Sequence, residues 1–274
     1  MNKIHTVIWL AIFCCLTGCE QSKEPEFKAP MGPYGLPYRV GSLAGKPVNL
    51  GEEVRWLEYE DSPLLKRENR YKGYKPPSRN YQSVVTSFEI IMKYTTGAPL
   101  MRYYKAPQAP VKQYDAEQSD PNNKWIYIGV RSGVRFDETG DLTKAYLRYL
   151  EDINKKPKDE EDKYNFHYKY VSANIIEYGL EKYSPHPIWV NFSGYNNTDD
   201  LYVNKNENKI VTYITCSHSE VDLARKCSMT WTLEPKMKIL IKVTFQRSNL
   251  KDWKLIKRVS EEEVNKLFIN KMLD

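Results

Sequence analysis

Apolar and polar residues alternate along three successive segments in the last third of the chain. The apolar positions are Ile210, Ile214 and Cys216 in the first segment, Cys227, Met229, Trp231 and Leu233 in the second, and Met237, Ile239, Ile241, Val243 and Phe245 in the third. Successive side chains of a β-strand point to opposite faces of its sheet, so this period of two predicts three strands. We therefore expect an antiparallel meander with one buried face.

Shorter runs of the same kind predict further strands. They lie at 54–59, 84–94, 125–131, 175–183 and 188–192. In the second of these runs the residues expected on the buried side are Val84, Phe88, Ile90, Met92 and Tyr94. These runs add to the meander, so β-structure should dominate the fold.

Two segments have helical spacing. Residues 142–153 predict an internal helix, and Ser260-Glu261-Glu262-Glu263 has the form of a capping box that begins a closing helix. The apolar stripe of that closing helix comprises Val264, Leu267, Phe268 and Met272. Residues 107–123 and 155–163 are expected to be loops, and residues 196–200 a turn. The predicted fold class is α+β, a mainly antiparallel β-sheet with a few helices, including a C-terminal amphipathic helix.

The first nineteen residues have the features of an export signal. A short basic start with Lys3 precedes an apolar run of about 11 residues, half of what a helix needs to cross a hydrocarbon core of ~30 Å. The run ends in Leu16-Thr17-Gly18-Cys19, which resembles the lipobox of bacterial lipoproteins. The resemblance implies cleavage before Cys19 and lipidation of its thiol. The alternative is an ordinary signal peptide with an incidental cysteine.

The lipobox divides the chain into three parts. Residues 1–18 would be the signal peptide, 19–33 a lipid-anchored tether and 34–274 a globular domain, in which 155–163 is the expected boundary if there are two subdomains. Residue 20 is Glu and not Asp, which by resemblance to enterobacterial sorting implies the periplasmic face of the outer membrane. Several acyl chains on one residue anchor a protein almost permanently.

The charge of the chain is mildly basic. The formal net charge is +6 for the whole sequence, and only Lys3 would leave with the signal peptide. A small excess spread along the chain suits an acidic partner or an anionic surface, but it is far from the footprint of a nucleic-acid-binding protein. No apolar run after residue 19 is long enough to span a bilayer.

Two cysteines are left for structural use. Cys14 and Cys15 would leave with the signal and Cys19 would carry lipid, so Cys216 and Cys227 remain as a pair in an oxidising compartment. We expect a disulfide between them, worth about 3 kcal/mol by the chain-entropy estimate. A zinc site would need more ligands, and only His218 lies near.

The sequence contains no catalytic motif, metal-ligand spacing or cofactor fingerprint. Neither a Gly-x-Ser-x-Gly elbow nor a His-Glu-x-x-His pair occurs, and the mature histidines are widely separated at His167, His186 and His218. The chain has 21 Tyr and 6 Trp, residue types that dominate binding hot spots. A binding protein is therefore expected, without a catalytic residue, metal or cofactor.

Several motifs together resemble a known family. They are Pro-Tyr-Gly-Leu-Pro at 33–37, Tyr-Ile-Thr-Cys at 213–216, Cys-Ser-Met-Thr-Trp-Thr-Leu-Glu-Pro-Lys-Met-Lys-Ile at 227–239 and Leu-Lys-Asp-Trp at 250–253. With the lipobox, they resemble lipoprotein immunity proteins encoded beside type VI secretion lipase effectors of Gram-negative bacteria. The resemblance implies an inhibitor that binds a phospholipase toxin in the periplasm. The alternative is an envelope lipoprotein that binds cell-wall glycan or an envelope assembly machine.

The segment 217–226 is the candidate partner contact. A disulfide at its base would pre-organise it, and its charged groups could pair with a partner protein. Those groups are His218, Glu220, Asp222 and Arg225. The alternative is an ordinary surface hairpin loop.

Overall fold

The computed structural model describes the chain in several stretches. These are residues 27–62, 75, 77–101, 103, 105–133, 142, 170–185, 187, 190, 198–207, 209–233 and 238–269. The lipobox with Cys19, the helix expected at 142–153 apart from Leu142, and the loop expected at 155–163 lie outside the described residues. So do Met237, Met272 and the strand expected at 188–192, apart from Val190.

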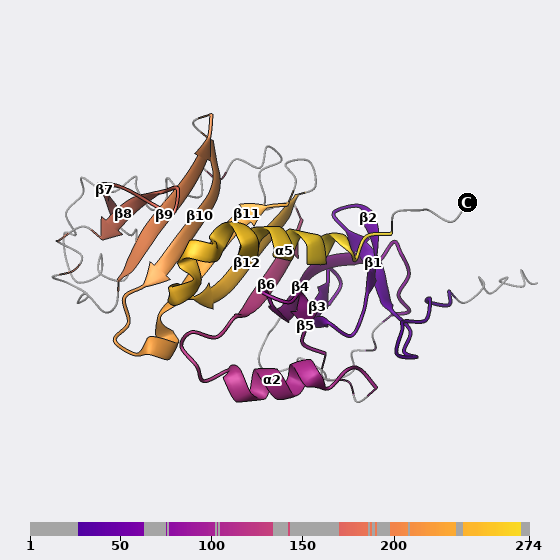
Figure 1. Cartoon of the computed structure of the whole chain (residues 1–274). Helices are drawn as coiled ribbons and strands as arrows, with labels where there is room; N and C mark the ends of the chain where they lie inside the picture. Colours follow the sequence, from indigo (N-terminus) through magenta and orange to yellow (C-terminus); the bar gives the residue numbers. More distant parts are fainter. Residues whose placement is uncertain are drawn as a thin grey trace, which may run out of the picture.

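The described residues form one large, mostly antiparallel sheet (Figure 1). Its strands are β1 (Arg39–Leu43), β2 (Lys46–Leu50), β3 (Val54–Tyr59), β4 (Val84–Lys93), β5 (Ala98–Pro99), β6 (Trp125–Ser132), β7 (Tyr170–Glu177), β8 (Leu180–Pro185), β9 (Asp199–Asn206), β10 (Lys209–Ser217), β11 (Lys226–Thr232) and β12 (Ile239–Gln246). The order across the sheet is β2-β1-β4-β6-β12-β11-β10-β9-β8-β7, and β3 and β5 also pair with β4. Only the short β1–β4 contact is parallel among these pairs. The expected α+β class and the meander of β10, β11 and β12 are confirmed.

One face of the sheet packs against the closing helix α5 (Trp253–Asn265), which crosses several strands (Figure 1). Trp253, Ile256 and Val264 of the helix join the main core, which also holds Trp231, Phe245 and the other inward residues of the meander. The apolar faces of these strands therefore pack against the apolar stripe of α5, and burial of the two apolar surfaces stabilises the sheet.

The closing helix begins seven residues before the expected capping box. Ser260 lies inside α5, where its hydroxyl donates a hydrogen bond of 2.7 Å to the carbonyl of Ile256. The helix instead follows directly on the 3₁₀ segment η3 (Arg247–Asp252), and Asp252 accepts a hydrogen bond of 2.7 Å from the hydroxyl of Tyr94. The expected start was wrong because a Ser-x-x-Glu pattern also occurs within helices, where a serine can bond the preceding turn.

A helix, α2 (Ala109–Glu117), lies where the sequence predicted a loop at 107–123. Pro110 stands in its first turn, a position that tolerates proline because the first N–H groups of a helix have no intrahelical partner. Tyr114 of α2 packs on Trp125 with ring centroids 5.1 Å apart, and this contact covers part of the second face of the sheet. The prolines therefore mark the beginning of a helix.

Two strand predictions need correction. Val84 was expected on the buried side of its strand, but it is 42% exposed and Val85 is buried. Glu58 and Tyr59 of β3 pair with Ser87 and Val85, so β4 has one extra residue between these two pairs, which shifts the alternation. The strand expected at 175–183 is instead the hairpin β7–β8, with Tyr178 and Gly179 both at positive φ in its turn.

The turn expected at 196–200 is in part a strand. β9 begins at Asp199, inside that segment, and Asp200 is buried. Two successive aspartates are typical of turns, and here the second is held in the sheet by nearby cationic side chains.

Candidate functional site

The β10–β11 connection at 217–226, called here the disulfide-closed loop, is closed at its base by a covalent bond. Cys216 and Cys227 lie directly opposite each other on the two strands, with Cα atoms 4.1 Å apart, and form a disulfide. Both are completely buried. The pairing expected from the sequence is therefore present in the structure.

Hydrogen bonds within the loop fix its conformation. The Arg225 side chain donates from Nε to the carbonyl of Ser219 at 2.6 Å, and the amide of Val221 donates to Ser219 Oγ at 3.2 Å. A short 3₁₀ segment, η2 (Asp222–Ala224), follows, in which the Ala224 amide donates to the carbonyl of Val221 at 2.8 Å. The loop is therefore ordered by its own contacts as well as by the disulfide.

Two apolar side chains are exposed on the loop. Val221 is 63% exposed and Leu223 is 39% exposed. Exposed apolar side chains on a rigid projection are the kind of group that anchors a protein–protein contact. Sequence reasoning weighed only the charged residues of this loop. The signal that could have found the apolar tip is Val-x-Leu at 221–223, inside an otherwise charged segment.

The four charged residues predicted as contacts fall into two groups. Glu220, Asp222 and Arg225 lie exposed on the loop, and Asp222 pairs with Arg225 at 3.2 Å. His218 instead points into the base of the loop, where its Nε2 lies 3.0 Å from Asp200 Oδ1. His218 is thus placed to hold the loop, and the three exposed residues remain predicted contacts.

Asp200 is the centre of the ionic cluster beneath the loop. Its carboxylate pairs with the guanidinium of Arg247 and lies 3.8 Å from Lys182 Nζ. Arg247 also donates from Nη1 to the carbonyls of Cys216 and Ser217, both at 2.9 Å. One guanidinium therefore joins β9, the end of β10 and the start of η3.

The cluster lines an open recess of about 460 Å³. Burial raises the pKa of the neighbouring Asp199 carboxyl, and the charges of His218 and Arg247 only partly oppose this. Burial alone would lower the pKa of Lys182, but Asp200, Tyr202 and Glu177 outweigh it, so that pKa is raised. Lys182 therefore keeps its positive charge in the recess, where it pairs with Glu177 at 3.2 Å.

Comparisons with known proteins give the following. No family model matches the chain, and no curated protein matches it. One similar solved structure is Smlt3025, an immunity protein of the Stenotrophomonas maltophilia type IV secretion system, with 12% sequence identity, a TM-score of 0.45 and coverage of 89% of this chain and 94% of that one. Another is the Neisseria meningitidis iron-regulated outer membrane lipoprotein FrpD, with 13% identity, a TM-score of 0.38 and coverage of 90% and 98%. Both TM-scores are too low to carry an inference about this chain.

Two further findings concern the described part of the chain. In its described stretches, no group of three or more His, Cys, Asp or Glu residues is arranged to hold a metal ion. No described helix has both the length and the apolar character to cross a membrane. What these residues offer instead is a rigid loop with an apolar tip above an ionic recess.

The disulfide should contribute measurably to stability. Replacing Cys216 and Cys227 together with alanine should lower the free energy of unfolding by about 3 kcal/mol, because the unfolded chain regains the freedom that the closed loop denies it. Urea unfolding of the oxidised protein and of the double variant measures the difference. Equal unfolding midpoints would contradict the prediction, and so would quantitative thiol alkylation of the native protein without reductant.

Proposed function

We propose that this chain is a lipid-anchored envelope protein that acts as an immunity protein: it binds a type VI secretion phospholipase toxin and inhibits it. The observation that carries the proposal is the disulfide-closed loop with Val221 and Leu223 exposed at its tip. The motif resemblance at 213–239 and 250–253 includes both cysteines of this loop and supports the same conclusion.

The loop has the physical properties that an inhibitor needs. Association costs conformational entropy, and a loop already fixed by a disulfide and internal hydrogen bonds loses little of it on binding. The two apolar side chains can be buried by a partner, while Glu220, Asp222 and Arg225 around them can form charged contacts at the rim. Occlusion is enough for inhibition, so the proposal requires no catalytic group.

The proposed lipid anchor would keep the inhibitor where the toxin acts. The 14 residues 20–33 that follow Cys19 reach at most roughly 46 Å at ~3.3 Å per residue, and confinement to the membrane raises the local concentration of the inhibitor there. The Leu-x-Gly-Cys ending and Glu20 support attachment through Cys19 at the periplasmic face of the outer membrane.

Lipidation can be tested at the cysteine itself. Replacing Cys19 with serine should leave unprocessed precursor and abolish labelling by radioactive palmitate, because serine lacks the thiol that receives the lipid. The Cys14→Ser/Cys15→Ser variant is the matched control, since both residues precede the expected cleavage site, and it should label normally. Normal labelling of the Cys19→Ser variant would contradict the lipoprotein assignment.

Inhibition is tested with the lipase encoded beside this chain. The fragment 24–274 should form a stable complex with it and suppress hydrolysis in stoichiometric proportion, with a sharp break at a fixed molar ratio. Suppression at trace amounts would indicate an enzyme that inactivates the toxin. Absence of binding at micromolar concentration would refute the immunity function and favour the alternative, a lipoprotein that binds cell-wall glycan or an envelope assembly machine.

A further inference from the structure

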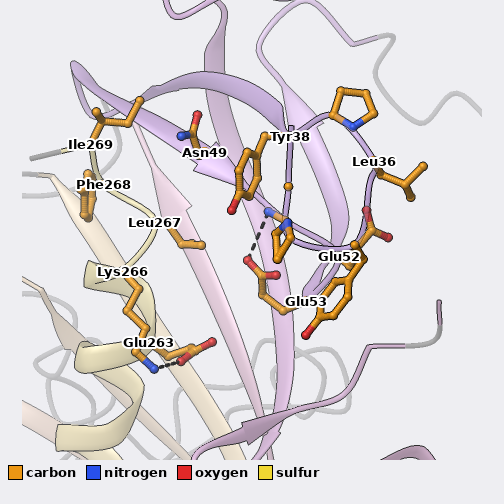
Figure 2. A pocket seen from close by; sticks show the side chains of 15 residues that line it. Leu36, Tyr38, Asn49, Glu52, Glu53, Glu263, Lys266, Leu267, Phe268 and Ile269 are labelled. Carbon is orange, nitrogen blue, oxygen red and sulfur yellow. Dashed lines mark hydrogen bonds and ion pairs between the residues drawn. The ribbon is translucent and has the colours of Figure 1, made fainter. Parts of the chain in front are cut away.

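A second recess, the strap pocket, lies at the far end of α5 from the disulfide-closed loop (Figure 2). It has a volume of about 340 Å³, within the range of small-molecule sites. Its walls come from the strap 32–38, from residues 49–53 around the end of β2, and from residues 263–269 at the end of α5. None of these residues belongs to the proposed toxin contact.

Backbone pairing holds these three walls together. The Asn49 amide donates to the carbonyl of Leu267 at 2.9 Å, and the Ile269 amide donates to the carbonyl of Pro47 at 3.1 Å, so the segment after α5 is fixed along β2. Within the strap, the Gly32 amide donates to the carbonyl of Leu36 at 2.7 Å. The pocket is therefore a built feature of the fold.

Three glutamates, Glu52, Glu53 and Glu263, line the strap pocket. Glu263 is buried and pairs at 2.7 Å with Lys266, whose side chain is largely exposed at the rim. Glu53 accepts a hydrogen bond of 3.2 Å from the Gly51 amide, and no ion pair to it occurs among the described residues. The nearby Arg39 donates to the carbonyls of Gly51 and Val54 instead. Among the described residues, the Glu53 carboxylate therefore forms no ion pair, and the charge of Arg39 acts on it only from beyond contact distance.

The surroundings of Glu53 disfavour its negative charge. Burial raises the pKa of the Glu53 carboxyl and the charge of Glu263 raises it further, while the backbone amides of Glu53 and Gly51 and the charge of Arg39 only partly oppose this. A cation bound in the pocket would relieve this cost, because an opposite charge nearby favours the ionised form.

The remaining walls are aromatic and apolar. Tyr34, Tyr38 and Phe268 line the pocket, with Tyr38 on the side where Glu53 lies and Phe268 on the opposite side (Figure 2). The ring of Phe268 already has Lys46 Nζ at 5.9 Å from its centroid. Aromatic faces beside a carboxylate are the surroundings that attract an ammonium group carrying alkyl substituents. A bare metal ion would not use the aromatic walls.

We propose that the strap pocket binds an alkylammonium group, with Glu53 as its counter-ion and Lys266 at the rim for an attached phosphate. The zwitterionic headgroups of phosphatidylethanolamine and phosphatidylcholine carry both charges, and free ethanolamine or choline carries the ammonium alone. The strap begins within the last two residues of the expected tether, so this wall of the pocket lies close to the proposed anchor in sequence. The proposal does not depend on inhibition of a toxin.

Gly51 offers a way to move the Glu53 carboxylate without removing it. A Cβ at Gly51 would lie 2.4 Å from Glu53 Oε2, so alanine at this position must displace that carboxylate. The clash is with the end of a flexible side chain and not with backbone, so the fold should tolerate it. Gly51→Ala therefore tests the position of the charge, and Glu53→Gln tests the charge itself.

Binding is measured by isothermal titration of the full chain in non-ionic detergent. The probes are ethanolamine, choline, glycerophosphoethanolamine, glycerophosphocholine and, as the anion control, inorganic phosphate. Glu53→Gln and Gly51→Ala should each weaken binding of the ammonium probes at least about tenfold, because a charged hydrogen-bonding partner is lost or misplaced. Glu262→Gln, an exposed carboxylate on α5 that pairs with Arg258, is the matched control and should bind like the unchanged protein.

The outcomes separate the two ligand sources. Tighter binding of the glycerophospho compounds identifies a lipid headgroup, and equal binding identifies the free amine; both support the site. Absence of saturable binding at about 10 mM would overturn the proposal, and so would equal affinity in Glu53→Gln. Circular dichroism of each variant checks that it is folded, and toxin inhibition measured on the same samples distinguishes failure here from failure of the proposed function.

Discussion

Replacing Val221 and Leu223 together with aspartate should lower the affinity for the toxin by about a thousandfold. Each residue that anchors an interface contributes about 2 kcal/mol or more, and two such losses correspond to roughly three orders of magnitude in Kd. Aspartate also adds charges that the partner would have to desolvate. Both side chains are exposed in the free protein, so the fold itself should be unaffected. Surface plasmon resonance with the immobilised lipase measures the change.

A matched control uses the exposed isoleucines of β7. Ile175 and Ile176 are also apolar and solvent-exposed, but they belong to the β7–β8 hairpin and not to the disulfide-closed loop. Their replacement with aspartate should leave the affinity within about twofold, as expected for changes outside the contact. Unchanged affinity in the Val221→Asp/Leu223→Asp variant would exclude the tip as the contact. Alanine replacements should cover Glu220, Asp222 and Arg225 and spare His218, because His218 pairs with Asp200.

Replacing Arg247 with alanine should lower the free energy of unfolding by about 3–5 kcal/mol. Removal of one partner from a buried ion pair leaves the other charge buried without compensation, and Asp200 is almost completely inaccessible to solvent. The carbonyls of Cys216 and Ser217 would also lose their donor. The remaining partners, Lys182 at 3.8 Å and His218, cannot replace three contacts of one guanidinium. Urea unfolding followed by tryptophan fluorescence measures the loss.

The matched control for Arg247 is Arg258 on α5. Arg258 pairs with Glu262 at 3.0 Å, but its side chain is 63% exposed, and such surface pairs contribute little. Arg258→Ala should therefore change the free energy of unfolding by less than about 0.5 kcal/mol. Similar values for the two variants would show that the Asp200 cluster is not a structural centre. A double replacement, Asp200→Asn with Arg247→Ala, should recover part of the loss, because the buried charge is then absent.

The parts of the fold that could be predicted are the strands in which the spacing of apolar residues matches the face that the folded chain buries. Burial alternates along the whole of β10 and along much of β6, β11 and β12, because one face of each strand packs on the core. Prediction failed where a long-range contact decides the local structure. The extra residue in β4 depends on pairing with β3, and the beginning of α5 depends on Trp253 reaching the core. Neither contact can be predicted from the spacing of apolar residues along the sequence.

The candidate site could be predicted only in part, for the same reason. The two cysteines pointed to the loop, but the role of His218 depends on Asp200 and Arg247, which come from other strands and a 3₁₀ segment. The strap pocket had no sequence signal, because residues 32–38, 49–53 and 263–269 meet only in the folded chain. The sequence alone favours the charged residues of the loop as contacts over Val221 and Leu223. Whether an apolar side chain of a loop is exposed depends on its neighbours in the folded chain.

The pairing of the segment after α5 with β2 also places the two ends of α5 at different parts of the molecule. The strap and the end of α5 meet at one end of the sheet, whereas the disulfide-closed loop lies beside the start of that helix, where the Arg247 amide donates to the carbonyl of Arg225 (Figure 1). A helix of 13 residues is about 20 Å long at ~1.5 Å per residue. Under the proposed anchoring at Cys19, α5 would act as a spacer between the strap, which continues the proposed tether, and the disulfide-closed loop beside the start of the helix.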